Sequence, residues 1–160
     1  MIKDIYFAGG CFWSVQMLFS DIKGVNSSIS GYANGKDGII PNYELVCTGT
    51  TDFRETVKVS YDDKIVSLED LVKVFYSVID PTQYMGQGYD KGTQYQTGIY
   101  FVDEDSKKVV EEITSKVKEE YNRFYVETLP LKNFYEAEEV HQDYLKKNPK
   151  GDKVSVAGEY

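Results

Sequence analysis

The stretch IYFAGGCFW, residues 5–13, decides how the fold begins. Its first four residues are aromatic or apolar and are followed by two glycines, which predicts a buried strand ending in a turn. Apolar residues then recur at helical spacing from Phe12 to Phe19, so a helix is expected after the turn. This arrangement places Cys11 at the N-terminus of the helix, where unpaired backbone N–H groups and the helix dipole favour a thiolate over a thiol. The pattern therefore predicts a reactive sulfur.

A buried, inert Cys11 is the alternative interpretation, because free cysteine is among the most buried residue types. The flanking residues favour reactivity instead. The two glycines let the backbone approach the sulfur closely, and Phe12 and Trp13 would be costly to expose unless they lined a pocket. Because an aromatic wall beside a thiolate suits a small apolar substituent such as a methyl group, Phe12 and Trp13 are candidate substrate-binding residues.

The composition of the chain indicates one globular domain over residues 1–160, with a polar tail from about residue 148 onward. The formal net charge is −8 and no block of Lys or Arg is present, which disfavours nucleic acid and anionic membranes as partners. The longest uncharged apolar stretch is far shorter than the roughly 20 residues of a membrane span, and no secretory leader is recognisable. We therefore expect a cytoplasmic protein, and a monomer.

Cysteine and histidine usage argues against a structural metal or a disulfide framework. The two cysteines, Cys11 and Cys47, lie far apart in the sequence, and the single histidine leaves no metal-binding motif. Glycines are scattered, and no phosphate-binding loop is present. We expect no metal and no bound cofactor.

Periodicity predicts the remaining secondary structure. Helices are expected at residues 67–79, 109–121 and 137–147, and strands at 24–32, 44–47, 55–61, 97–102 and 124–131, the last at a sheet edge because of Pro130. Long loops are expected at 35–43 and 81–92, where glycine and proline gather. Strands and helices mix without steady βαβ alternation, which favours a two-layer α+β sandwich.

A carboxylate interrupts the apolar face of one of these strands. Residues 55–61 alternate strictly, with Glu55 on the same face as Val57 and Val59. Burial of Glu55 would raise its pKa and keep a proton available for donation near neutral pH. The alternative is an exposed carboxylate at the strand start, paired with Arg54 or Lys58.

Three polar residues in or beside glycine-containing loops complete the candidate site. Tyr43 ends the loop at 35–43, while Asp90 and Tyr95 lie in the stretch GYDKGTQY, residues 88–95. Tyrosine hydroxyls can bond a polar oxygen without carrying charge. A purely structural role is the alternative for either tyrosine, because the chain contains 14 of them.

Four motifs in fixed order give the chain a resemblance to peptide methionine sulfoxide reductases of the A type. GGCFW at 9–13 is similar to the GCFW signature of that family, and YELVCTG at 43–49 is similar to its YEEVC[TS]G stretch. GYDKGTQY at 88–95 resembles its GxDxGxQY loop, and FYEAEEVHQDY at 134–144 resembles its FYxAExxHQxY segment. Together the motifs span nearly the whole chain.

The resemblance implies a reaction and roles for named residues. Cys11 is implied to be the nucleophile that attacks the sulfur of methionine S-sulfoxide. Glu55 is implied to be the acid that protonates the sulfoxide oxygen. The product is methionine plus a sulfenic acid on Cys11, which a thiol must then reduce. The implied substrate-binding groups are Phe12 and Trp13 around the methyl group, Tyr43 and Tyr95 on the oxygen, and Asp90 for positioning. The implied fold is α+β, and we expect a mixed or antiparallel sheet with helices around a ferredoxin-like core.

The chain departs from the family pattern in ways that bear on recycling. Many members carry resolving cysteines in a C-terminal tail, but this chain ends VAGEY, residues 156–160. We therefore expect an external reductant, namely thioredoxin, glutaredoxin or a small thiol, with Cys47 as the internal alternative. Residues 52–55 read DFRE where the family commonly has GHAE, so the surroundings of Glu55 differ. Ser14 replaces a frequent glycine. Oxidised proteins and peptides containing methionine sulfoxide are the implied partners.

Two other functions remain open from the residues alone. A thiol peroxidase would also cycle through a sulfenic acid, but it leaves the Phe12–Trp13 pair unexplained. A peptide-binding module would use the aromatic pocket with Cys11 merely buried. His141, in the last motif, is interpreted as a hydrogen-bonded structural group and not as a catalyst.

Overall fold

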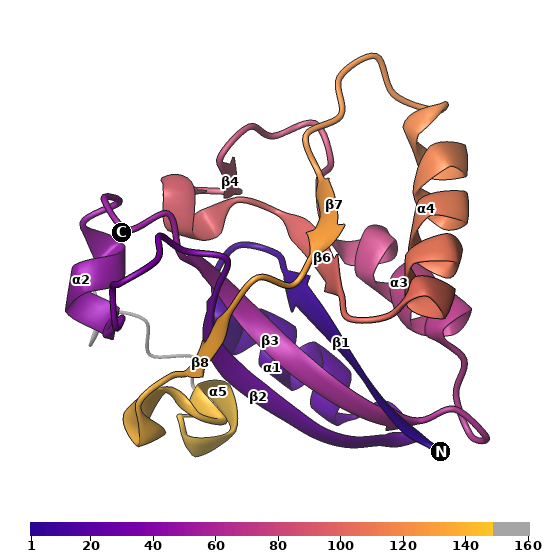
Figure 1. Cartoon of the computed structure of the whole chain (residues 1–160), viewed down its shortest axis with the longest axis horizontal. Helices are drawn as coiled ribbons and strands as arrows, with labels where there is room; N and C mark the ends of the chain where they lie inside the picture. The colour runs from indigo at the N-terminus through magenta and orange to yellow at the C-terminus, as the bar shows by residue number, and fades with distance from the viewer. Residues whose placement is uncertain (149–160) are drawn as a thin grey trace.

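The strand predicted before the two glycines lies in the middle of a six-stranded sheet. In the computed structural model, which describes residues 1–148, the strand order is β7-β6-β1-β3-β2-β8 (Figure 1). The strands are β1 (Ile2–Ala8), β2 (Val25–Ala33), β3 (Arg54–Asp62), β6 (Gly98–Phe101), β7 (Glu127–Pro130) and β8 (Phe134–Glu136). The tail predicted from about residue 148 to 160 lies, apart from Asn148, outside the described residues.

The four central strands have ferredoxin-like connectivity. Helix α1 (Phe12–Ser20) links β1 to β2, and helix α3 (Leu68–Val78) lies between β3 and β6. The order β6-β1-β3-β2 is antiparallel throughout, β7 pairs with β6 in parallel, and β8 pairs with β2 antiparallel. The α+β class, the mixed sheet and the ferredoxin-like core predicted from the sequence are confirmed.

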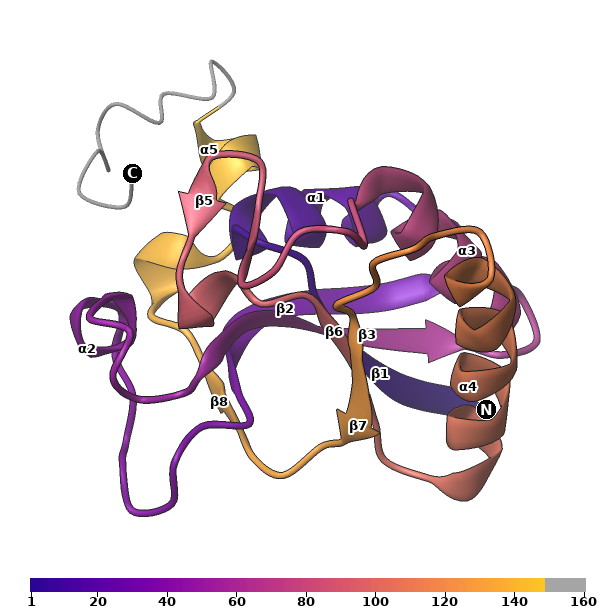
Figure 2. The same cartoon turned by 90° about the horizontal axis from the view of Figure 1, so that it is seen from above.

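Helices cover one face of the sheet (Figure 2). Phe7 of β1 is fully buried there. Its ring stacks on Phe19 of α1, with centroids 4.5 Å apart, and packs at a tilt against Phe75 of α3, with centroids 5.0 Å apart. Helix α4 (Glu104–Lys118) packs beside α3, where the hydroxyls of Tyr76 and Thr114 are 2.7 Å apart. Because aromatic side chains bury the most apolar area, this layer fixes the height of α1 above β1.

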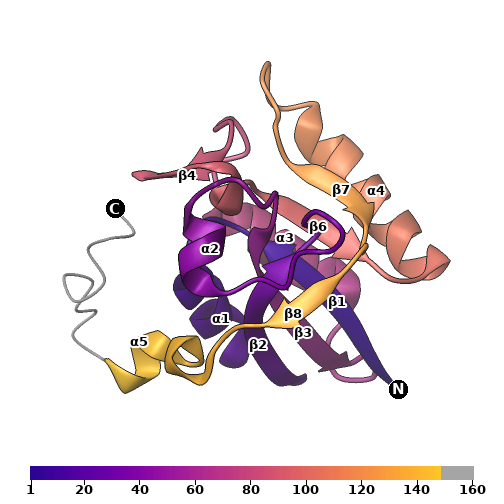
Figure 3. The ribbon, with the colours of Figure 1, turned by 60° about the vertical axis from the view of Figure 1, so that its left-hand side comes forward.

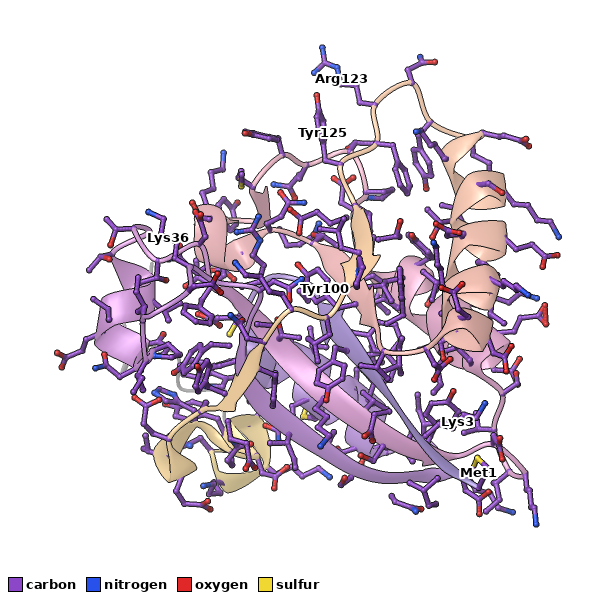
Figure 4. The ribbon with its side chains drawn as sticks, viewed as in Figure 1. Met1, Lys3, Lys36, Tyr100, Arg123 and Tyr125 are labelled. Carbon is purple, nitrogen blue, oxygen red and sulfur yellow. The ribbon has the colours of Figure 1, made fainter. Side chains whose placement is uncertain are left out.

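The opposite face carries a smaller core around Tyr6, Ala8, Ala33 and Tyr100. The hydroxyl of Tyr100, labelled in Figure 4, donates to Glu127 Oε2 at 2.8 Å. Arg54 Nη2 pairs with the other oxygen of Glu127, also at 2.8 Å. This network joins β3 and β6 to the edge strand β7, which is found where the sequence predicts it.

Two helix starts follow from side-chain caps. Ser67 accepts from the Asp70 N–H at the start of α3, as its spacing predicts. Asp103 accepts from the Ser106 N–H, so α4 begins about a turn before the apolar stripe that marks it in the sequence.

The predicted strand at residues 44–47 is wrong, because these residues form a short helix, α2 (Tyr43–Cys47). The Asn42 side chain caps it by accepting from the Leu45 N–H at 2.9 Å. The loop at 81–92 contains a small hairpin of β4 (Gly86–Gln87) and β5 (Asp90–Lys91), followed by the 3₁₀ turn η1 (Thr93–Tyr95).

The single helix predicted over residues 137–147 is also wrong. A 3₁₀ turn η2 (Glu139–His141) and helix α5 (Tyr144–Lys147) follow β8, separated by Asp143 in the left-handed region at φ 51°. The Gln142 side chain bonds the backbone of Ser30 and of Ala137 in place of continuing a helix. Tertiary hydrogen bonds therefore override the local helical spacing. Over the described range, no helix has the length and apolar character needed to cross a bilayer.

Candidate active site

Cys11 sits directly before α1, as its sequence neighbours predict. Its backbone is extended (φ −64°, ψ 123°), its side chain is half-buried, and it forms no cap hydrogen bond with the helix. The turn needs a glycine at position 10 for two reasons. Its φ of +84° is strained for residues with a side chain, and a Cβ there would lie only 2.8 Å from Gln87 Cβ of the β4–β5 hairpin. The sulfur is thus held at the positive end of the helix and close to the hairpin.

Glu55 is buried beside this helix start. Its side chain is 1% exposed, and its Oε1 accepts a hydrogen bond from the Phe12 N–H at 3.2 Å. Burial raises its pKa to about 8; the Phe12 hydrogen bond opposes that rise and the charge of Asp90 adds to it. Glu55 is therefore largely protonated at neutral pH, and its carboxyl group contacts the residue that follows Cys11.

The alternative of an exposed, paired Glu55 is excluded. Arg54 pairs with Glu127, and Lys58 lies 4.0 Å from Asp4. The burial predicted from the strict alternation of residues 55–61 is confirmed, since Glu55 faces the helices together with the apolar residues of β3.

The aromatic pair after Cys11 belongs to a buried ring cluster. Phe12 and Trp13 are each 1% exposed, and Phe12 packs against Tyr43 with ring centroids 6.3 Å apart. Trp13 stacks on Tyr144 at 3.9 Å, and its Nε1–H donates to His141 Nδ1 at 3.3 Å. The two rings form the wall behind Cys11 and do not line the open groove beside it.

His141 holds this cluster together. Its ring stacks on Tyr43 with a centroid distance of 4.1 Å, and burial lowers its pKa. A neutral ring can accept the Trp13 hydrogen bond, which a doubly protonated ring could not. This geometry fits the structural role predicted for His141.

Two buried polar atoms near Cys11 have no hydrogen-bond partner within residues 1–148: Glu55 Oε2 and the Tyr43 hydroxyl. Both belong to residues that touch Phe12. Buried polar groups are nearly always satisfied in folded proteins, so such atoms mark a place where a ligand supplies the missing partner. When each group carries its proton, both can donate a hydrogen bond to an acceptor oxygen of a ligand.

Tyr95 and Asp90 come from the loop at 81–97 to the same region. Tyr95 is 1% exposed, and its pKa is raised first by burial and then by the charges of Glu55, Cys47, Asp90 and Cys11. Its hydroxyl therefore stays protonated and neutral. Asp90 is half-buried, and it lines the groove that opens at Cys11. All seven site residues predicted from the sequence thus gather around the start of α1.

Cys47 is the last residue of α2 and is half-buried. Burial raises the pKa of its thiol to about 12, with added contributions from Glu55 and Glu138. The thiol form therefore prevails at neutral pH, which makes Cys47 a poor nucleophile.

The sequence analysis assigned no role to Glu138, although it lies in the last motif. One of its oxygens accepts from the Tyr32 hydroxyl at 2.7 Å and the other from the Tyr43 N–H at 3.0 Å. It thus ties the C-terminal segment to α2, which Figure 3 shows above the chain that runs from β8 to α5. Its place in that motif, three residues before His141, is the sequence feature that could have identified it as a site residue. Within residues 1–148, no group of three or more His, Cys, Asp or Glu side chains lies close enough together to hold a metal ion.

Comparisons with known proteins agree with this geometry. The family described as peptide methionine sulfoxide reductase matches residues 3–159. The peptide methionine sulfoxide reductase MsrA of Clostridium acetobutylicum is 51% identical over 151 residues, which cover 94% of this chain and 93% of the relative. The MsrA of Mycoplasma genitalium is 46% identical, over 94% of this chain and 96% of its own.

Solved structures share the fold. The reduced form of Mxr1 from Saccharomyces cerevisiae superposes with a TM-score of 0.89 at 37% identity, covering 94% of this chain and 87% of Mxr1. Methionine sulfoxide reductase A of Corynebacterium diphtheriae gives 0.83 at 36% identity, covering 94% and 76%. Mxr1 in complex with Trx2 gives 0.63 at 27% identity, covering 89% and 84%.

Proposed function

The chain belongs to the peptide methionine sulfoxide reductase family, and on that premise we propose that it reduces peptide-bound methionine S-sulfoxide with Cys11 as nucleophile and Glu55 as proton donor. We treat residues 1–160 as a single catalytic domain. The observation that carries the proposal is a carboxyl group with a pKa of about 8, bonded to the Phe12 N–H next to Cys11, whose second oxygen has no partner in the described residues.

In the proposed step, the Cys11 thiolate attacks the substrate sulfur while Glu55 protonates the sulfoxide oxygen. An unprotonated sulfoxide oxygen is a poor leaving group, so the acid lowers the barrier. The sulfoxide gains two electrons and becomes a thioether. The S–O bond of the substrate breaks, and the oxygen with its new proton passes to the Cys11 sulfur, which loses two electrons and becomes a sulfenic acid. Glu55 is left as a carboxylate and regains its proton from solvent.

The other site residues bind and orient the substrate in this proposal. The hydroxyls of Tyr43 and Tyr95 donate to the sulfoxide oxygen and stabilise the charge that develops on it. The rings of Phe12 and Trp13 provide the apolar wall for the methyl group, and Asp90 positions the substrate beside Cys11. Because both rings are buried, the methyl group reaches them only from the Cys11 side.

An external thiol completes the cycle. Two thiols convert the sulfenic acid to the free thiol and water, with formation of a disulfide between them. The raised pKa of Cys47 disfavours internal resolution. Mxr1, a structural relative, has been crystallised with Trx2, so we propose a thioredoxin as reductant, with glutaredoxin or a small thiol as alternatives. Since the cycle needs reduced thiols, we place the protein in the cytoplasm.

A single-turnover experiment tests this proposal. The reduced protein is mixed with separate S and R epimers of a methionine sulfoxide peptide, without reductant, and product and protein mass are followed. We expect one methionine per protein from the S epimer and a protein heavier by one oxygen; Cys11→Ser should form none. Faster turnover of hydrogen peroxide than of sulfoxide would favour a peroxidase. Loss of two hydrogens from the protein would indicate a Cys11–Cys47 bond and overturn external recycling.

A further inference from the structure

A groove of about 590 Å³ opens at Cys11 and follows α1 toward its C-terminal end. Its walls are α1 and α3, which lie on the same face of the sheet (Figure 2), and Gln87 and Asp90 of the β4–β5 hairpin close one end. Most of the lining is apolar. Two of its apolar side chains are unusually exposed, Met17 at 40% and Val78 at 56%.

Resting on the proposed function, we propose that this groove holds the polypeptide that flanks the oxidised methionine, in extended conformation and on one side of it only. A methionine side chain that reaches Cys11 must bring its own main chain to the mouth of the groove. The next residues of that chain then lie along the groove or in water. Apolar flanking side chains are more stable along the groove than in water, because the groove removes their surface from solvent.

The length of the groove sets how much substrate it holds. It runs from Cys11 to Asp21 along α1, a distance of about 15 Å at 1.5 Å per residue. An extended chain advances by about 3.3 Å per residue, so about four residues fit. Leu18 and Val78 stand beside the middle of this path, and exposed Ser14 offers a hydroxyl to the peptide main chain near Cys11.

Side-chain hydrogen bonds hold the hairpin end of the groove in place. The Gln87 side chain donates to the Asp80 carbonyl and to Thr97 Oγ1, and accepts from the Asp80 N–H, which fastens the hairpin to the end of α3. At the floor, a Cβ on Gly9 would lie only 3.1 Å from the Phe75 ring. A preformed groove spends little free energy on ordering when the peptide binds.

The charged residues that line the groove restrict the bound peptide less than its apolar residues do. The groove lining contains the carboxylates of Asp21 and Asp90 and, within the described part of the chain, no Lys or Arg. Asp21 pairs with Lys146 of α5 at 3.3 Å, so part of its charge is compensated. The preferred flank is therefore apolar, and acidic flanks are disfavoured.

A set of peptides tests the inference. Each peptide contains one methionine S-sulfoxide, and the four positions on either side of it are filled with Leu or with Ser. N-acetyl methionine S-sulfoxide amide serves as a substrate without flanking residues. We expect Leu on one side to raise kcat/KM about tenfold over Ser, and Leu on the other side to change it little. An equal effect on both sides, or none, would overturn the one-sided groove. If the wild type reduced none of these sulfoxides, that result would instead refute the proposed function.

Variants then locate the effect. Met17→Gln combined with Val78→Gln should remove the advantage of the Leu flank and leave turnover of the flankless substrate unchanged. The matched control is Val102→Gln combined with Ile65→Gln, at sites 52% and 54% exposed outside the groove, which should behave as wild type. A raised KM for thioredoxin with unchanged peptide preference would assign the groove to the reductant, and a loss of dimers in solution would assign it to a second copy; either result would overturn the inference.

Discussion

At the scale of single residues, the proposed chemistry depends on one buried carboxyl group. Glu55 was recognisable because strict alternation places it on the apolar face of a strand, and the structure confirms its burial at 1% exposure. Desolvation favours its neutral form, while the Phe12 N–H favours the carboxylate. Desolvation is the larger effect, so the proton remains available near neutral pH.

Glu55→Gln should lower kcat/KM about 10²- to 10⁴-fold, the usual contribution of a positioned acid. In the wild type, sulfoxide reduction should decline as pH rises through about 8, where Glu55 loses its proton. The variant should lack that alkaline decline, because an amide does not titrate. A pH profile of single-turnover rates measures both effects, and an unchanged alkaline decline in the variant would assign it to another group.

The same substitution should change how stability depends on pH. The folded pKa of Glu55 lies above its unfolded value of about 4.5, so between about pH 4.5 and 8 the folded state holds a proton that the unfolded state has released. This group therefore costs stability as pH rises through that window, by at most about 1.4 kcal/mol per pH unit. Urea unfolding of Glu55→Gln across the window should show a flatter dependence than the wild type.

At the scale of elements, the short helix α2 is held in place from outside. Five residues are too few for a stable isolated helix, so α2 depends on the Asn42 cap and on Glu138, which accepts from the Tyr43 N–H and the Tyr32 hydroxyl. The Tyr43 hydroxyl is one of the two buried polar groups near Cys11 that lack a partner in the described residues. The position of that hydroxyl is thus set by a residue 95 positions later in the chain.

Glu138→Ala should lower kcat/KM about tenfold, because it leaves the Tyr43 N–H and the Tyr32 hydroxyl without their acceptor and lets α2 shift. Glu138→Gln should restore most of the activity, since an amide oxygen can accept from the N–H while its NH₂ donates to the hydroxyl. Steady-state kinetics of both variants, with melting temperatures as a control, check this. Equal activity loss in both would show that the charge, and not the positioning, matters.

At the scale of the whole molecule, a polar network fastens the C-terminal segment to the sheet. Gln142 bonds the N–H and carbonyl of Ser30 in β2, and it also accepts from Gln16 of α1. The Gln16 side chain in turn accepts from Ser30 and from the Asp143 N–H. Residues 137–148, which carry Glu138 and His141, are therefore positioned by buried hydrogen bonds as well as by apolar packing.

Gln142→Ala should loosen this segment before it loosens the sheet. Removing the amide takes away the partner that it gives to the Ser30 N–H and to the Ala137 carbonyl, at a cost of about 1–3 kcal/mol for each group left unsatisfied. Amide hydrogen exchange should accelerate in residues 137–148 far more than in β1 and β3. The control is Gln83→Ala, which removes a half-buried amide that bonds only the Gly88 backbone in another loop and should leave exchange in both regions unchanged. Uniform acceleration in Gln142→Ala would mean that the segment does not open independently.

Local patterns in the sequence were sufficient for the parts of this protein that rest on near neighbours. The turn before Cys11, the buried face of β3 with Glu55, the Ser67 cap and the α+β class all follow from the periodicity and residue types of short stretches. The family motifs added the roles that we propose for Tyr43, Tyr95 and Asp90, which no local pattern could assign.

Tertiary structure alone decided the position of α2, the broken C-terminal helix, the contacts of Glu138 and Gln142, and the groove between α1 and α3. The hydrogen bonds of Glu138 and Gln142 link residues about 95 to 126 positions apart. A bond between such distant residues has no periodic trace in the sequence, and it outweighs the local propensity of segments only three to five residues long. A groove likewise exists only once two helices lie on the same sheet face.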